Sequence, residues 1–247
     1  MTTQEKAIAK SETGKVGDTI KAKSAGWSFG GETPASFEDH VAKSVPLYQE
    51  GHDVVVQLSD YFLHQNSLCY EIGSSTGVLL DKVVNHNHQK NIRAVGIDVE
   101  SDMVAFAKQK YTKPNISFVN ADIAEFDLEN ADMIVSYYTL QFIKPKFRMD
   151  VLRQIYDALN WGGALLLFEK VRAPDARFQD IMSSLYIEYK IDQGYDAGEI
   201  LSKSRSLKGV LEPFSTGGNL DLLRKAGFED IMTVMKYVSF EGFLAIK

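Results

Sequence analysis

The sequence is poor in the features that mark several classes of protein. Its 247 residues contain one cysteine, Cys69, which excludes an internal disulfide framework and a zinc site built from a cysteine cluster. No apolar run approaches the roughly 20 residues that a membrane-spanning helix needs. Residues 1–26 also lack the apolar segment of a signal peptide. We therefore expect a cytoplasmic protein that does not use a membrane.

Basic residues are fewer than acidic ones. Lysine and arginine number 27 against 33 acidic residues, for a net charge of −6, and five of the lysines lie within residues 1–26. A protein that grips long stretches of nucleic acid usually has the opposite balance. The five histidines lie mostly in polar surroundings, so no metal site is predicted. A small-molecule substrate is expected, without an extensive nucleic-acid surface.

Short apolar runs alternate with helical stretches through the middle of the chain. The predicted strands are Leu68–Ile72, Ala94–Ile97, Ile116–Val119, Met133–Ser136 and Ala164–Phe168. Between them the spacing predicts helices over Gly77–Asn85, Asp102–Tyr111 and Phe147–Leu159, the last closed by the glycines of Asn160-Trp-Gly-Gly. Such alternation is typical of an α/β fold, in which helices cover both faces of a parallel sheet.

The flanking segments divide the rest of the chain. Lys-, Ser- and Thr-rich residues 1–26 are expected to form a flexible tail, and 27–66 a helical cap with helices from Ser36 and over Tyr48–Phe62. Residues 67–169 would form the core, and 170–219 a helical insertion after the fifth strand, with a helix over Phe178–Ile191. Residues 220–247 would return to the core as a helix (Leu220–Ala226) and a hairpin (Ile231–Tyr237, Phe240–Ile246), which adds an antiparallel strand.

The most informative segment is Cys69-Tyr-Glu-Ile-Gly-Ser-Ser-Thr-Gly. It places Glu71 at the end of the first strand and Gly73 and Gly77 in the following turn, which predicts a ligand cradle. The spacing is E-x-G-x-x-x-G instead of G-x-G-x-x-G, so a nicotinamide dinucleotide is not expected. The carboxylate of Glu71 would repel a pyrophosphate, but it suits a cationic or hydroxyl-bearing ligand. A turn whose small residues serve packing alone is the alternative.

Two further acids follow the next two strands. Asp98 ends the second strand, where a carboxylate can accept from both ribose hydroxyls of a nucleoside. Asp122 follows the third strand and is placed to accept from an adenine amino group. Each could instead cap the element that follows it. The three acids after three successive strands predict one nucleoside-binding crevice.

This order of motifs resembles the class I S-adenosylmethionine-dependent methyltransferases. The resemblance rests on E-x-G-x-x-x-G, Asp98, Ala-Asp122-Ile and Leu159-Asn-Trp-Gly-Gly. It implies a Rossmann-like seven-stranded sheet with an antiparallel last strand, and S-adenosylmethionine as the cofactor. The chain departs from many members at Ser75, where they have a third glycine.

A closer resemblance, over roughly residues 27–247, is to the carboxy-S-adenosylmethionine synthase family. It is carried by Ser44-Val-Pro-Leu-Tyr, Tyr138-Thr-Leu-Gln-Phe, Glu169-Lys, Gly194-Tyr-Asp-Ala-Gly-Glu-Ile, Ser202-Lys-Ser-Arg-Ser-Leu and Lys225-Ala-Gly-Phe-Glu. By this resemblance the cofactor pocket would include Tyr48, Gly73, Ser74, Ser75, Asp98, Val99, Asp122 and Ile123. Arg205 would hold a carboxylate on the modified sulfonium, because a guanidinium binds carboxylates bidentately. Tyr137 and the turn Gly73-Ser-Ser-Thr depart from the family.

The sequence predicts an S-adenosylmethionine-dependent transferase and leaves its reaction open. One reading is methyl transfer to an acceptor that the sequence does not name. The other is synthesis of carboxy-S-adenosylmethionine with prephenate as the carboxyl donor, and a non-catalytic nucleoside-binding protein is a third. Glu169 is a candidate substrate contact, with a helix cap or an ion pair with Lys170 as the alternatives. A homodimer is expected from the insertion, whose helix presents Ile181, Leu185, Tyr186 and Tyr189.

Overall fold

The computed structural model describes residues 33–247, so the tail predicted over residues 1–26 lies outside the described part of the chain. The helices are α1 (Thr33–Ser44), α2 (Tyr48–Phe62), α3 (Val78–His86), α4 (Ser101–Lys110), α5 (Pro145–Ala158), α6 (Ala176–Asp192), α7 (Ala197–Ser206) and α8 (Thr216–Ala226). The strands are β1 (Leu68–Ile72), β2 (Arg93–Asp98), β3 (Ile116–Asn120), β4 (Ala131–Tyr137), β5 (Leu159–Lys170), β6 (Asp230–Tyr237) and β7 (Phe240–Ile246). None of the helices in this part of the chain is long and apolar enough to span a membrane.

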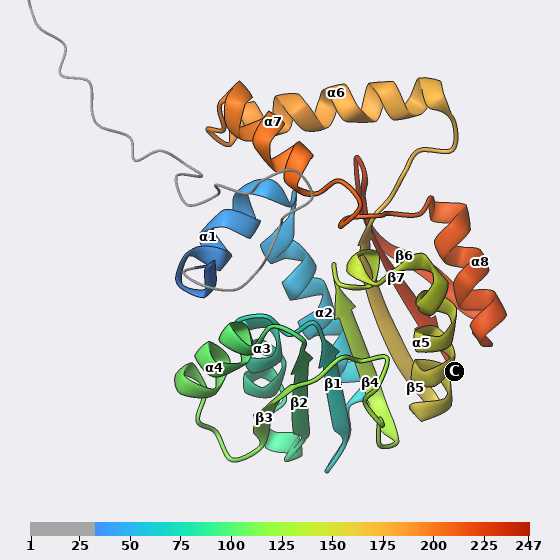
Figure 1. Cartoon of the computed structure of the whole chain (residues 1–247). Coiled ribbons are helices and arrows are strands. Elements are labelled where there is room, and N and C mark those ends of the chain that lie inside the picture. Colours follow the sequence, from blue (N-terminus) through green and yellow to red (C-terminus); the bar gives the residue numbers. More distant parts are fainter. Residues whose placement is uncertain (1–32) are drawn as a thin grey trace, which may run out of the picture.

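The strands form one sheet in the order β3-β2-β1-β4-β5-β7-β6. The strands from β3 to β5 are parallel, and β7 pairs antiparallel with both β5 and β6. This confirms the predicted seven-stranded sheet with its antiparallel last strand. Figure 1 shows the sheet between two groups of helices, with α5 and α8 on one side and α2 to α4 on the other.

Alternating side chains of each central strand feed two separate cores. Cys69 of β1 and Phe168 of β5 belong to the core under α2 and α3, whereas Tyr70 and Leu167 belong to the core under α5 and α8. All five residues of β1 are buried, as expected for a parallel strand that is covered on both faces. This continuous burial is the reason why the strands read as short, unbroken apolar runs.

The insertion after β5 supplies α6 and α7, which lie beyond one end of the sheet (Figure 1). An Asp side chain caps each helix: Asp175 accepts from the backbone N–H of Phe178, and Asp196 from that of Glu199. Helix α6 is unusual because its one buried residue is charged, Lys190. The insertion therefore forms mainly a cover over the sheet end, and Tyr186 packs against the core under α2 and α3.

Two boundary predictions are wrong. Helix α5 ends at Ala158, and Asn160-Trp-Gly-Gly belongs to the irregular start of β5 instead of closing the helix. Gly162 does have a positive φ of 79°, but its N–H donates to the carbonyl of Lys247, so it serves pairing with the C-terminal strand. Helix α1 begins at Thr33, three residues before the expected Ser36, with Pro34 in its first turn, where no amide hydrogen is needed.

Candidate active site

The order in which the chain adds strands to the sheet reverses between β1 and β4. The chain builds outward from β1 through β2 to β3, and then returns to the other side of β1 for β4 and β5. The crevice at the carboxyl ends of the strands beside such a switch is where open α/β sheets bind ligands. A cleft of about 1380 Å³ lies there, and its lining comes from the ends of β1 to β5 and from α1, α6 and α7. This exceeds the roughly 300–1,000 Å³ of most small-molecule sites, so the cleft has room for two ligands.

The turn after β1 depends on its glycines. Gly73 has φ +72°, and a Cβ added to it would lie 2.1 Å from Oγ1 of Thr139. Gly77 has φ +80°, and a Cβ there would lie 2.6 Å from the ring of Phe118. Both the positive φ and the lack of space exclude a side chain. The predicted cradle is therefore a tight turn that keeps its backbone close to the cleft.

Ser75 also lies in the left-handed region, with φ +48°. A non-glycine residue in this region carries strain of about 1–3 kcal/mol. Its backbone N–H donates to Oδ2 of Asp98 at 2.8 Å, and the other oxygen of Asp98 accepts from the backbone N–H of Glu100 at 2.9 Å. Asp98 thus holds the turn in place while it lines the cleft. The missing third glycine changes the strain of this turn and not its path.

Three acidic side chains gather at this end of the cleft. Burial is the main cause that raises the pKa of Glu71, Asp98 and Glu38, and the charge of Glu38 raises that of Glu71 further. Oε2 of Glu71 and Oε2 of Glu38 are buried and have no hydrogen-bond partner among the described residues. Glu38 comes from α1, and its other oxygen accepts from the hydroxyl of Thr76. The sequence did not predict a role for Glu38, because nothing near it indicates that α1 folds over the turn.

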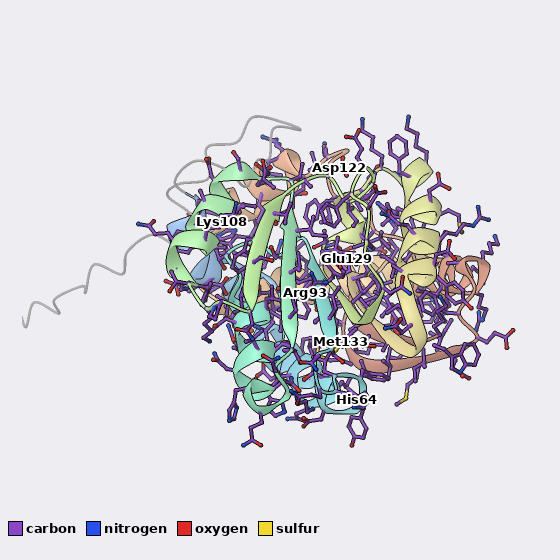
Figure 2. All side chains as sticks on the ribbon, turned by 90° about the horizontal axis from the view of Figure 1, so that it is seen from below. His64, Arg93, Lys108, Asp122, Glu129 and Met133 are labelled. Carbon is purple, nitrogen blue, oxygen red and sulfur yellow. The ribbon has the colours of Figure 1, made fainter. Side chains whose placement is uncertain are left out.

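The remaining predicted contacts of the nucleoside lie at the ends of β2 and β3. Asp122 lines the cleft as an exposed side chain, and its Oδ1 accepts from the backbone N–H of Ala124 at 2.9 Å. In Figure 2, Asp122 lies at the end of the sheet opposite His64. Val99 is 66% exposed beside it, whereas Ile123 is buried. An exposed valine at the rim and a carboxylate beside it suit a flat base with an exocyclic amino group.

Aromatic side chains form the wall between the two ends of the cleft. The hydroxyl of Tyr137 donates to the carbonyl of Tyr48 at 2.7 Å, and both rings pack against His52. Burial lowers the pKa of His52 to about 3, so this ring is neutral. Tyr138 has φ +60°, and its buried hydroxyl has no partner among the described residues. Tyr137 and Tyr48, predicted separately, are therefore parts of one packed unit.

The opposite end of the cleft is cationic. Lys170 at the end of β5, Lys190 in α6 and Lys203 in α7 all line it. Glu169 points away from them: it is buried, its Oε1 accepts from the backbone N–H of Gln141 at 3.2 Å, and burial raises its pKa to about 8. Glu169 forms no ion pair with Lys170; its bond to Gln141, in the short 3-10 helix Leu140–Phe142, is instead the helix-capping role that the sequence also allowed. The sequence did not predict this group of three lysines, which are distant from one another in the chain and belong to no shared motif.

Arg205 lies on α7 with an exposed side chain, and it is absent from the lining of the cleft. Neither Glu199 nor Glu212, its two possible partners in the sequence, forms an ion pair with it. Instead, Glu199 forms a capping box with Asp196 at the start of the same helix. The other predicted site residues, Gly77 excepted, line the cleft directly.

The fold and this cleft define an S-adenosylmethionine-dependent transferase of the methyltransferase type. Residues 70–163 match a family model described as a methyltransferase domain. Human N-acetylserotonin methyltransferase, solved with S-adenosylmethionine, superposes with a TM-score of 0.60 at 17% identity, over 87% of this chain and 56% of that one. A putative S-adenosylmethionine-dependent methyltransferase from Methanococcus maripaludis gives 0.59 at 17% identity, over 90% and 94%.

Comparison with relatives of known name gives the family. A carboxy-S-adenosyl-L-methionine synthase from Staphylococcus epidermidis is 38% identical over 222 residues, which cover 90% of this chain and 97% of the relative. The synthase from Campylobacter jejuni is 35% identical over 223 residues, with 90% and 94% covered. The chain belongs to the carboxy-S-adenosyl-L-methionine synthase family.

Proposed function

We propose that this protein converts S-adenosylmethionine to carboxy-S-adenosylmethionine, with prephenate as the carboxyl donor. The observation that carries the proposal is the match, over nearly their whole length, to relatives named for that activity. The size of the cleft supports it, since the reaction needs room for the cofactor and a second molecule together.

The residues at the acidic end fit S-adenosylmethionine. The carboxylate of Asp98 would accept from the ribose hydroxyls, and Asp122 from the adenine amino group, with Val99 and Ile123 against the base. Oε2 of Glu71, buried and without a partner among the described residues, suits the cationic half of the cofactor. Gly73, Ser74 and Ser75 would bring the turn close to it, and Tyr48 and Tyr137 would pack beside it. The cofactor supplies a positively charged sulfonium, which activates the adjacent methyl group.

A homodimer is the second part of the proposal. Helix α6 exposes Phe178, Ile181, Leu185, Ile187 and Ile191, each more than 40% exposed. Ile187 lines the cleft, whereas Phe178, Ile181 and Leu185, at spacings of three and four, share one face of the helix. Such a row of apolar side chains is more economically buried against a second subunit than left in water. Tyr186 was expected on this surface, but it faces the cleft instead. Arg205 belongs to the same insertion, so its proposed carboxylate contact depends on how the insertions of two subunits meet.

Methyl transfer to an unidentified acceptor is the second candidate. It is favoured by Tyr137, which stands where the resembled family has an asparagine, and by the altered turn Gly73-Ser-Ser-Thr. An acceptor that is already nucleophilic needs no catalytic base, because alignment with the sulfonium supplies much of the rate.

Mass spectrometry of the small molecules separates these functions. The protein is incubated with S-adenosylmethionine, with and without prephenate. We expect a new nucleoside, heavier than S-adenosylmethionine by one CO₂, only when prephenate is present. S-Adenosylmethionine or S-adenosylhomocysteine alone, unchanged by prephenate, contradicts the synthase proposal and leaves the methyltransferase. Binding without turnover across acceptor panels indicates a nucleoside-binding protein. Light scattering at micromolar concentration tests the dimer, and a monomer mass refutes it.

A further inference from the structure

Three lysine side chains from three elements meet on one wall of the cleft. The ammonium group of Lys170 lies 4.2 Å from the centroid of the Tyr186 ring, and that of Lys190 lies 4.5 Å from the same centroid. The ammonium group of Lys203 lies 5.7 Å from the Tyr195 ring and 2.8 Å from Nε2 of His40. We call Lys170, Lys190 and Lys203 the lysine cluster.

In the described part of the chain, no carboxylate balances Lys170 or Lys190. Lys190 is only 7% exposed, and neither lysine has an acidic side chain within ion-pair distance among the described residues. Lysines are rarely this buried unless they are paired. Burial, followed by the charges of neighbouring lysines, lowers the pKa of Lys170 to about 8 and that of Lys203 to about 7. His40, a hydrogen-bond partner of Lys203, has a neutral ring, because burial lowers its pKa to about 3.

Aromatic contacts account for only part of this arrangement. An ammonium over an aromatic ring gains about 0.5–2 kcal/mol, whereas the burial of an unpaired ion costs several. A purely structural role would also be better served by an apolar side chain of the same length. A cluster of like charges that lines a cleft large enough for two ligands is instead expected where an anion binds.

A buried hydroxyl lies beside the cluster. The ring of Phe240 lies 5.3 Å from that of Tyr186 and 5.8 Å from that of Tyr138, centroid to centroid, and the ammonium group of Lys170 is 5.7 Å from Phe240. The hydroxyl of Tyr138 is buried and has no hydrogen-bond partner in the described part of the chain. Tyr138 and Lys170 both line the cleft, so this hydroxyl is a candidate donor to a ligand held by Lys170.

We propose that the lysine cluster is the binding site for a small molecule with two carboxylates. Two carboxylates suit three ammonium groups, and the apolar rings of Tyr186 and Phe240 suit the carbon skeleton between them. The inference rests on the proposed function in one respect: the dicarboxylate is taken to be the carboxyl donor for a cofactor at the acidic end. The site itself requires only the lysines.

Binding measurements on matched variants test the cluster. Lys170→Met and Lys190→Met remove the charge but keep an unbranched stem over Tyr186. Lys190→Arg keeps the charge, and Lys225→Met, on the exposed side of α8 away from the cleft, is the control. Calorimetry measures the affinity for prephenate and for malonate, with and without S-adenosylmethionine. We expect each Met variant to bind both probes at least about tenfold more weakly, and Lys190→Arg and Lys225→Met to bind them within a few-fold of the parent.

Two further readouts make the result decisive. Affinity for S-adenosylmethionine should change less than about twofold in the Met variants, since the cofactor end does not touch the cluster. The melting temperature without ligand should stay equal or rise, because a repulsion is removed; a structural role predicts a fall. Equal affinity of the parent and both Met variants for both probes overturns the inference. Absence of S-adenosylmethionine binding, with dicarboxylate binding intact, overturns the proposed function and leaves the lysine cluster standing.

Discussion

The two ends of the cleft differ in both charge and origin. At one end Glu71 is buried and Glu38 and Asp98 are half-buried, and at the other Lys190 is buried and Lys170 is half-buried. The acidic end is built mainly by strand ends and the turns that follow them, whereas the basic end needs β5 and the two helices of the insertion. In the proposed function, the core of the fold would therefore provide the cofactor end, and the inserted segment would provide the second ligand site.

At each end of the cleft, the burial of charged side chains of one sign is unfavourable while no ligand is bound. Burial pushes the acidic side chains towards their neutral form and the lysines towards theirs, because a low-dielectric environment disfavours the ion in both cases. A cation at the first end and an anion at the second would each relieve this cost. Ligand affinity at the two ends should therefore respond in opposite directions to a change in pH.

The largest effect is expected at the turn after β1. Gly73→Ala places a Cβ 2.1 Å from Oγ1 of Thr139 at φ +72°, and should lower the free energy of unfolding by about 3 kcal/mol, with loss of cofactor binding. Denaturant unfolding measures the change. Gly162→Ala is the control, since its φ is +79° but no atom lies within 4 Å of the added Cβ. Equal losses in the two variants would mean that the collision with Thr139 contributes nothing.

The next effect separates the two ends directly. Asp98→Ala removes charge-assisted hydrogen bonds to the ribose, and should weaken S-adenosylmethionine binding by about 1–3 kcal/mol. Dicarboxylate binding at the lysine cluster should be unchanged, because the two sites lie at opposite ends of the cleft. Calorimetry with each ligand provides the measurement. Unchanged affinity for S-adenosylmethionine would remove Asp98 from the cofactor site.

The dependence on pH should have opposite signs at the two ends. As the pH falls, the carboxyls of Glu38, Glu71 and Asp98 protonate at higher pH than usual, so binding of the cationic cofactor should weaken towards acid pH. As the pH rises through about 7 and about 8, Lys203 and Lys170 lose their protons, so dicarboxylate binding should weaken.

The expected effect of pH on dicarboxylate affinity follows from the loss of single ammonium charges. Loss of one ammonium charge should cost about tenfold in dicarboxylate affinity, measured by calorimetry across the neutral range. The titratable groups that face the lysine cluster do not reverse the sign: His40 is neutral because its pKa is lowered to about 3, and Tyr195 has its pKa raised to about 12. Parallel pH profiles for the two ligands would contradict the charge separation.

The smallest effect is expected at Ser75. Ser75→Gly relieves the strain of φ +48° but adds flexibility to the unfolded chain, so the net gain in stability should be about 0.5 kcal/mol. Thermal unfolding should show a rise of about 1–2 °C. A fall in the melting temperature would mean that the contact of Oγ with Sδ of Met103 stabilises the turn more than the strain costs.

The elements and the acidic end could largely be predicted from the sequence. Strand β7 has the predicted bounds, and Glu71, Asp98 and Asp122 all line the cleft as expected. Each of these predictions used a local pattern, an apolar run or an acid directly after one. Asn160-Trp-Gly-Gly misled because glycines suit a helix end and an irregular strand equally well, and pairing with Lys247 decides between them.

The basic end could not be found in this way. Lys170, Lys190 and Lys203 are each an ordinary lysine in their local sequence, and only the fold of the insertion places them around Tyr186 and Tyr195. Glu38 is hidden for the same reason, since it acts on Glu71 across a gap of 33 residues. Arg205, by contrast, was singled out by its family block, yet the fold places it on an exposed face.

The sequence by itself determined the parallel sheet, the order of the motifs along the chain and the positions of the acids that follow β1, β2 and β3. It did so because hydrophobic periodicity and strand-end residues act over a few positions, and parallel strands bring their ends to one edge. Only the tertiary structure decided which charges share the cleft and which are left without a partner. The pKa of a lysine or a glutamate depends on every group within several ångströms in space, and sequence distance carries no information about that neighbourhood.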